Sequence, residues 1–178
     1  MKKGGKFKID FSEVIKNRYS CKKFSEKKVE KEKLEIILEA GRVAPTAKNF
    51  QEQHIYVVQS ESGLAAIDKV TPCRYGATTV LVVAFDKNNV FTYPGGTRNS
   101  GIEDASIVAT HMMLAAYNEG VDSCWINFFN PDEFAQILNL PENEEILMLL
   151  DLGIAAEGTR PLPNHNSRKE VSETITYI

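Results

Sequence analysis

The sequence predicts an α+β fold in a single domain spanning residues 1–178, with helices packed on one central sheet. Three observations lead to this prediction. The chain is 178 residues long, which suits one domain. It contains both amphipathic helical segments and short apolar strand segments, but these do not alternate strictly as in a doubly wound fold. It also has no internal repeat and no sign of a second domain.

Two amphipathic helices are predicted near the start of the chain. Asp10 followed by Glu13 is typical of a capping box, and it predicts a short helix that ends near Asn17. A second helix is predicted over residues 30–42, and Pro45 closes that region. Apolar residues recur at helical spacing in both segments: Phe11, Val14, Ile15, Leu34, Ile37 and Leu38.

Four segments rich in β-branched and aromatic residues predict the strands. They are HIYVV (54–58), TVLVVAF (79–85), SCWINFF (123–129) and EILMLLDLGI (145–154). The second and the fourth are the most apolar, and we expect them to be buried. A small helix is predicted around residues 63–70, between the first two strands.

Residues 86–101 have loop composition, and the longest predicted helix, residues 102–120, follows them. This helix is apolar on more than one face, which places it at the centre of a domain or in a subunit interface. Gly120 stands where a helix-ending glycine is expected. Asn130 and Pro131 are typical of the start of another short helix.

The last residues combine a polar loop, PLPNHNSRKE, with the segment VSETITYI (171–178). We expect this final segment to be an extended strand. Because the chain offers little for it to pack against, the segment is predicted to pair with another subunit.

The overall composition, with 43% hydrophobic and 25% charged residues, is typical of a globular protein. The basic N-terminus has no apolar run behind it, so no secretory signal is predicted. The longest apolar runs are far shorter than the roughly 20 residues that a membrane span needs. Cys21, Cys73 and Cys124 form no CxxC pair and leave an odd count. We therefore expect a cytoplasmic protein with reduced thiols.

The charge of the chain is distributed unevenly. Residues 1–33 carry 12 Lys and Arg against 5 Asp and Glu, whereas residues 34–178 carry 9 against 19. A basic arm of this kind occurs in nucleic-acid-binding proteins. The basic segment is interrupted, however, by residues that we expect in the core: Phe7, Ile9, Phe11, Val14 and Ile15. No nucleic-acid partner is predicted, and a nucleic-acid or partner-binding module stays an alternative that would show a steep salt dependence.

The stretch NRYSCKKF (17–24) is a candidate anion site. If it is extended, Arg18, Ser20 and Lys22 share one face, with alternate residues about 6.6 Å apart, while Tyr19 and Cys21 point to the other. A guanidinium, a hydroxyl and an ammonium in one row suit a terminal phosphate. A row of solvated basic residues is the alternative interpretation.

No set of catalytic or metal-binding side chains can be recognised. The three histidines are too scattered for metal ligands, so no metal is predicted. P-loop and GxGxxG motifs are absent from the sequence, and no Ser/His/Asp or Cys/His set is evident. Cys124, inside an apolar strand, is expected to be an inert buried thiol.

In combination, these segments resemble the FMN-dependent nitroreductase family. Members carry R-x-S-x-[RK]-x-F after the first helix, here Arg18, Ser20, Lys22 and Phe24. A-P-S-x-x-N-x-Q-P-W corresponds to APTAKNFQEQ (44–53), and G-[LV]-x-[ST]-C-W to GVDSCW (120–125). A basic pair near the C-terminus corresponds to Arg168–Lys169. The correspondence runs in order from about residue 11 to residue 171.

The resemblance implies a nitroreductase-like central, mostly antiparallel sheet flanked by helices. It also implies a homodimer with an exchanged C-terminal segment and FMN sites at the interface. The implied activity is ping-pong hydride transfer from NADH or NADPH through flavin N5 to a nitroaromatic or quinone-like acceptor. No side chain need be catalytic, because the flavin carries the chemistry. FMN storage, redox sensing or a specialised flavin reaction such as dehalogenation are the alternatives.

The resemblance also implies a set of cofactor-binding residues. Arg18 and Ser20 would hold the phosphate and ribityl end, together with Arg168 or Lys169. Lys22 would serve either the phosphate or the N1–C2 carbonyl edge, and Arg74 is a second candidate for that edge. The full set is Arg18, Tyr19, Ser20, Lys22, Pro45, Thr46, Ala47, Asn49, Trp125, Ile126, Asn127, Arg168 and Lys169.

For two groups of these residues, the resemblance also implies which part of the FMN they approach. The loop Pro45–Asn49 would reach the FMN of the other subunit, and the backbone of residues 125–127 would lie near flavin N5 and O4. Three departures from the family pattern concern the pocket. The usual Q-P-W is Gln51-Glu52-Gln53, Asn127-Phe128 replaces a small residue, and the 86–101 connection is short. We therefore expect a small enzyme whose pocket is open or covered by a partner subunit.

Overall fold

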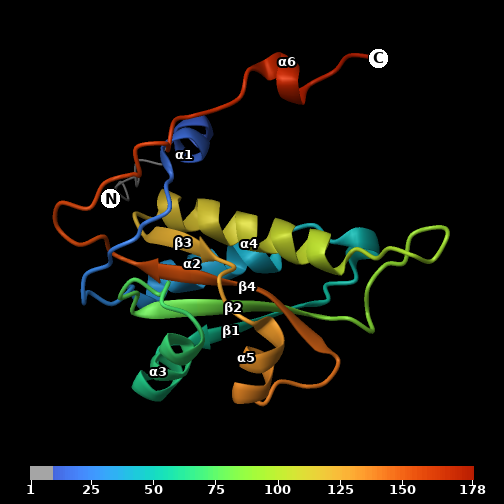
Figure 1. The fold of residues 1–178 in the computed structure, drawn as a ribbon, viewed down its shortest axis with the longest axis horizontal. Coiled ribbons are helices and arrows are strands. Elements are labelled where there is room, and N and C mark those ends of the chain that lie inside the picture. The colour runs from blue at the N-terminus through green and yellow to red at the C-terminus, as the bar shows by residue number, and fades with distance from the viewer. Residues whose placement is uncertain (1–9) are drawn as a thin grey trace, which may run out of the picture.

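A four-stranded antiparallel sheet forms the centre of the computed structural model, which describes residues 10–178 (Figure 1). The strand order is β1 (Gln53–Val58), β2 (Thr79–Asp86), β4 (Glu144–Gly153) and β3 (Asp122–Ile126). Every neighbouring pair is antiparallel. The predicted mixture of helices with a mostly antiparallel sheet is therefore confirmed.

Helices cover both faces of this sheet (Figure 1). One face carries α2 (Lys31–Arg42) and α4 (Gly101–Asn118), and α3 (Glu61–Val70) and α5 (Pro131–Ile137) lie on the other. The remaining helical elements are short: α1 (Phe11–Asn17), the 3₁₀ turn η1 (Ala47–Asn49) and α6 (Val171–Thr174). The layers are thus helix, sheet, helix.

The two central strands are buried on both faces, as their apolar sequences predict. Side chains alternate along β2, so Leu81 and Val83 contact the α2–α4 layer while Val80 and Val82 contact the α3–α5 layer. All four side chains have no solvent exposure. This burial on both sides explains why β2 carries no charge before Asp86.

α4 is the longer helix of its layer, and its buried residues include Ala105, Val108, Ala109 and Met112. It ends as predicted, because Gly120 adopts φ +70°, a left-handed conformation that glycine adopts without strain. None of the helices between residues 10 and 178 is long and apolar enough to cross a membrane.

The helix starts predicted at Asp10 and Asn130 are confirmed, although Glu13 accepts a hydrogen bond from Asn17 Nδ2 (2.7 Å) and does not complete the predicted capping box. The Asp10 carboxylate accepts a hydrogen bond from Ser12 N (2.9 Å), and the Asn130 side chain accepts from the first turn of α5. The core position predicted in α1 is confirmed for Val14 but wrong for Phe11 and Ile15, which are exposed. Phe7 and Ile9 lie outside the described residues.

Two strand predictions differ from the structure. β3 ends at Ile126, because the next residues turn, with Phe129 N donating to Asn127 O (3.0 Å). The C-terminal segment forms one helical turn, α6, which a capping box of Glu170 and Glu173 stabilises, before an extended end. In Figure 1 this segment runs away from the body of the molecule, and its residues from Asn166 onward are exposed.

Candidate functional site

The candidate site begins with the segment that follows α1. Cys21 N donates a hydrogen bond to Ser123 O (2.9 Å), and Ser20 forms a parallel bridge with Ser123. The segment therefore lies along β3. Cys21 is fully buried, whereas Ser20 and Lys22 are exposed, so the predicted alternation is confirmed over these three residues. Arg18 and Tyr19 are both half-buried.

A cavity of about 310 Å³ opens between this segment and the end of β3. Its lining brings together two predicted regions, Ser20 and Lys22 on one side and the stretch after Cys124 on the other. The complete lining is Ser20, Lys22, Cys73, Tyr75, Cys124, Trp125, Ile126, Asn127 and Phe128. Five of the predicted cofactor-binding residues thus share one cavity.

Lys22 is the cation of this cavity. Its Nζ lies 5.7 Å from the centre of the Tyr75 ring, within cation–π range. Between residues 10 and 178, no carboxylate lies within 4.0 Å of this ammonium group. The positive charge of Lys22 therefore faces the cavity without an acidic partner from the described part of the chain.

Trp125 and Phe128 shape the other side of the cavity. The indole Nε1 of Trp125 donates to Asn127 Oδ1 (2.8 Å), and its ring packs against the core on the α2–α4 side. Phe128 lines the cavity while remaining 73% exposed. Phe128, with the neighbouring Asn127, therefore stands at the edge of the cavity.

The cysteines of the site are free thiols that differ in exposure. Cys21 and Cys124 are buried, and Cys73 is half-buried. Burial raises the pKa of Cys124 to about 12 and also raises the pKa of Cys21. Neither buried thiol is a nucleophile near neutral pH, so the interpretation of Cys124 as an inert thiol is supported.

Asp151 lies beneath the cavity, and the sequence analysis did not single it out. It is the cross-strand partner of Cys124, has no solvent exposure, and neither carboxylate oxygen has a hydrogen-bond partner among the described residues. Burial raises the pKa of Asp151 to about 9, although Arg74 opposes the shift. The carboxyl group is therefore neutral at pH 7. The signal that could have identified it is a lone acid inside the apolar run EILMLLDLGI.

Arg74 does not line the cavity. Its guanidinium donates to both carboxylate oxygens of Asp68 (2.7 and 2.6 Å) and to Ala77 O (2.7 Å). These contacts fix the turn that precedes β2. Within the described chain, Arg74 is thus a structural residue, and Lys22 is the better candidate for a cation near a ligand.

Apart from Ser20 and Lys22, the residues predicted to bind the phosphate do not line the cavity. Tyr19 contacts His165 edge-to-face, with ring centres 6.4 Å apart, which brings the C-terminal loop beside the segment after α1. In that loop, Arg168 Nη1 donates to the carbonyl oxygens of His165 (2.7 Å) and Ser167 (2.6 Å). Arg18 is the C-cap of α1. The two basic segments are therefore neighbours, although the cavity lining includes none of Arg18, Tyr19, Arg168 and Lys169.

The loop Pro45–Asn49 lies elsewhere in the same chain. Ala47 N donates to Asp104 Oδ1 (3.0 Å) in the first turn of α4, whereas the cavity lies by β3, which follows the end of α4. None of Pro45, Thr46, Ala47 and Asn49 lines the cavity of their own chain. Local sequence patterns also gave no sign of Cys73 and Tyr75, which reach it from an irregular turn.

The chain is similar to known proteins over most of its length. The model of the family described as "Nitroreductase family" matches residues 15–75 and 71–154. A relative from Methanothermobacter thermautotrophicus, provisionally named as an NADH dehydrogenase/NAD(P)H nitroreductase, is 28% identical over 165 residues. These residues cover 87% of this chain and 83% of the relative.

The chain is also similar to solved structures over most of its length. The crystal structure of a nitroreductase family protein from Clostridium difficile 630 has a TM-score of 0.89 and 36% identity, covering 95% of this chain and 98% of the other. A protein from Exiguobacterium sibiricum, provisionally named as a nitroreductase and solved in complex with FMN, has a TM-score of 0.83. At 20% identity, covering 96% and 98% of the two chains, this second likeness shows the fold alone.

Proposed function

The chain belongs to the nitroreductase family, and from this premise we propose that it is an FMN-dependent oxidoreductase that uses NADH or NADPH. The observation that carries the proposal is the cavity that Lys22 and Ser20 share with the end of β3. When bound, FMN supplies hydride transfer from the nicotinamide to a nitroaromatic or quinone-like acceptor, in a ping-pong cycle. The protein supplies position and charge.

The residues of the cavity fit a flavin ring system. Cys124, Ile126 and Phe128 offer apolar surface for a planar ring, and Lys22 offers a cation with no carboxylate beside it among residues 10–178. Lys22 would bind either the phosphate or the N1–C2 carbonyl edge. At that edge, a cation stabilises the negative charge that reduction produces.

The neutral state of Asp151 supports this role for Lys22. A carboxylate beneath the cavity would partly cancel the field of the ammonium group, whereas a protonated carboxyl group does not. Because burial keeps Asp151 protonated at neutral pH, the charge of Lys22 would act on the ligand unopposed from below.

The phosphate end would lie toward the two basic segments. Arg18 follows α1, and the contact between Tyr19 and His165 brings the loop that holds Arg168 and Lys169 beside it. We propose that Arg18 and Ser20, with Arg168 or Lys169, bind the phosphate. Arginine suits this task because its planar donors match phosphate oxygens.

A homodimer would complete the site. The loop Pro45–Asn49 is held at the first turn of α4 and does not line the cavity of its own chain, so a second copy would supply it. Two surfaces support pairing. Ile102 and Ile107 on α4 are exposed, and so are large apolar side chains of the C-terminal segment, including Val171 and Ile175. We propose that this segment is exchanged between the two chains.

The proposal includes a cytoplasmic location, which the three free cysteines support.

The experiment that tests the function is the visible spectrum of the purified protein after FMN addition and desalting, followed by anaerobic addition of NADH or NADPH. A retained flavin spectrum that bleaches and then recovers with a quinone or a nitroaromatic is expected. Retained flavin without bleaching would favour storage, redox sensing or a specialised reaction, and loss of the flavin would contradict the proposal.

A further inference from the structure

Two buried carboxyl groups meet under the loop that contains η1. Glu52 precedes β1, Asp104 lies in the first turn of α4, and each is 4% exposed. Ser100 Oγ donates to Glu52 Oε1 (3.5 Å), but Glu52 Oε2 and Asp104 Oδ2 are buried without a hydrogen-bond partner among the described residues. Two acids that share a buried site cannot both ionise without a large cost.

Asp104 also holds the loop above it. Its Oδ1 accepts the hydrogen bond from Ala47 N (3.0 Å). The loop is strained, because three residues other than glycine have positive φ: Lys48 (53°), Asn49 (57°) and Gln51 (54°). Such a conformation persists only where its surroundings hold it. Besides Ala47, the loop is held by Thr46 Oγ1, which accepts from Gln51 N (3.0 Å).

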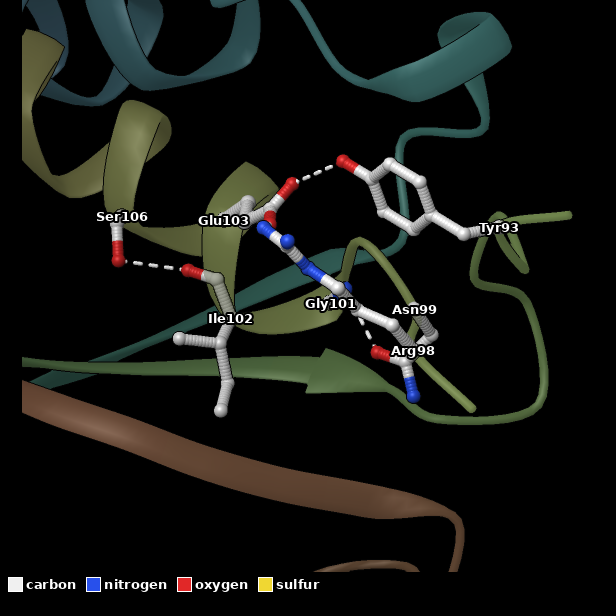
Figure 2. A network of polar contacts seen from close by, with 7 residues as sticks. All are labelled: Tyr93, Arg98, Asn99, Gly101, Ile102, Glu103 and Ser106. Carbon is white, nitrogen blue, oxygen red and sulfur yellow. Dashed lines mark hydrogen bonds and ion pairs between the residues drawn. The ribbon is translucent and has the colours of Figure 1, made fainter. Parts of the chain in front are cut away.

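The next loop closes the other side of the acid pair. Phe91 N donates to Ser100 Oγ (3.2 Å), and the Asn89 side chain donates to Phe50 O (3.1 Å). Figure 2 shows how this loop is fixed on the start of α4, where Tyr93 and Arg98 both bind Glu103. The loop, α4 and the start of β1 therefore enclose the pair.

The two acids have no cationic partner among residues 10–178. The charged groups that face them from the neighbouring elements are already engaged. Arg98 pairs with Glu103, and Lys48 lies over the ring of Phe91, 4.9 Å from its centre. In the described part of the chain, no Lys, Arg or His lies within 4.0 Å of either carboxylate. A proton is the remaining means of reducing the charge of the pair.

We propose that Glu52 and Asp104 form a proton-dependent clamp that positions the loop Pro45–Gln51. One proton on the pair keeps the two carboxyl groups together and leaves Asp104 as the acceptor for Ala47. Loss of that proton places two negative charges in one buried site and loosens the loop. Both residues are positioning residues, and the consequence for FMN rests on the proposed function, in which this loop reaches the cofactor of the other chain.

The direction of the effect follows from the proton balance. Burial, with the neighbouring Asp104, raises the pKa of Glu52 from 4.5 to about 7 in the closed state. A loop that opens exposes Glu52, which then regains its ordinary pKa. Opening therefore releases a proton between pH 4.5 and 7, so the clamp weakens as the pH rises through this range. Above about pH 7, Glu52 is ionised in both states and no further change is expected.

The test is amide hydrogen exchange of Ala47 in the FMN-free protein, followed by NMR and expressed as protection factors from pH 5 to 8. Protection of Ala47 is expected to fall with pH by up to about tenfold per unit below pH 7 and then to level off. The amide of Gly63 is a matched control. It donates a hydrogen bond to Ser60 Oγ (3.2 Å), and a hydroxyl group does not ionise in this pH range. Its protection is expected to be independent of pH.

Two variants separate the clamp from simple packing. Glu52→Gln keeps the shape of the side chain but cannot ionise, so it is expected to abolish the pH dependence at Ala47. Glu61→Gln removes an exposed carboxylate on α3 and is expected to behave as the wild type. If Glu52→Gln lowers the protection of the Ala47 amide equally at all pH values and keeps the wild-type dependence on pH, the proposal of a clamp is wrong. A flat wild-type profile also overturns it, whether or not the variant folds.

The affinity for FMN gives an independent second readout. Because the FMN phosphate itself titrates at about pH 6 in both proteins, the readout is a ratio of dissociation constants. The dissociation constant of the wild type divided by that of Glu52→Gln is expected to rise between pH 5 and 7. If the protein binds no FMN at any pH, the proposed function fails while the exchange test of the clamp still stands. If FMN binds with the same pH dependence in both proteins, the clamp does not act on the cofactor and that part of the proposal is wrong.

Discussion

The backbone N–H of Cys21 donates a 2.9 Å hydrogen bond to the carbonyl oxygen of Ser123. This single contact joins the segment after α1 to β3, although about a hundred residues separate them in the sequence. Because side chains alternate along the joined segment, it buries Cys21 and turns Ser20 and Lys22 toward the cavity. The position of Lys22 is thus set by backbone geometry, which makes its side chain suitable for substitution.

Lys22→Met is expected to weaken FMN binding by about 10- to 100-fold, since a hydrogen bond to a charged group contributes about 1.5–3 kcal/mol. The variant keeps the length of the apolar stem and removes the charge. Fluorescence titration with FMN measures the affinity, and a reductive titration measures the flavin potential, which is expected to become more negative. Lys87→Met, at an exposed lysine after β2, is the control. Unchanged affinity and unchanged potential in Lys22→Met would refute the assigned role.

The raised pKa of Asp151 predicts that the free energy of unfolding falls as the pH rises. Its pKa is raised from 3.8 to about 9 in the folded protein by burial. The unfolded chain therefore releases this proton at lower pH, and the contribution of Asp151 to stability falls as the pH rises from about 4 to 9. Asp151→Asn cannot ionise, so the variant is expected to gain stability relative to the wild type as the pH rises.

Urea unfolding at pH 5, 7 and 8.5 measures this difference. Glu145→Gln, an exposed acid on the same strand, is the matched control and should show no growing difference. If the Asp151→Asn and wild-type curves stay parallel across this pH range, the carboxyl group is not protonated in the folded state.

A mixed dimer tests whether two chains build each site. Lys22→Met and Asn49→Ala are each expected to weaken FMN binding when purified alone. If Lys22 of one chain and Asn49 of the other contact the same FMN, a dimer of one chain of each kind contains one site with both changes and one intact site. Co-expression with two different affinity tags isolates this mixed dimer. Recovery of wild-type affinity at one of its two sites is expected, and no recovery would place both residues in separate sites or in the same chain's site.

Local signals in the sequence predicted the elements that local chemistry determines. Gly120 ends α4, Asn130 caps α5, and the apolar runs of β2 and β4 occupy the centre of the sheet. In each case, the residues that cause the structure lie within or beside the element. The same holds for the alternation that separates Ser20 and Lys22 from Cys21.

Predictions that depended on a distant partner were less successful. An amphipathic pattern shows that Phe11 and Ile15 can be buried, but it does not say against what, and in this chain they are exposed. The pattern also could not show that the loop Pro45–Asn49 binds the first turn of α4 and does not line the cavity. Asp151 escaped notice because one acid in an apolar strand hardly changes the pattern of that strand.

The unequal exposure of the three free thiols has a practical consequence. Cys21 and Cys124 are buried, whereas the half-buried Cys73 lines the cavity. A small alkylating reagent is therefore expected to modify Cys73 first in the folded protein. A molecule bound in the cavity would shield that sulfur, so the rate of labelling would report occupancy. The natural sequence thus provides a chemical probe with which unlabelled compounds can be screened for binding.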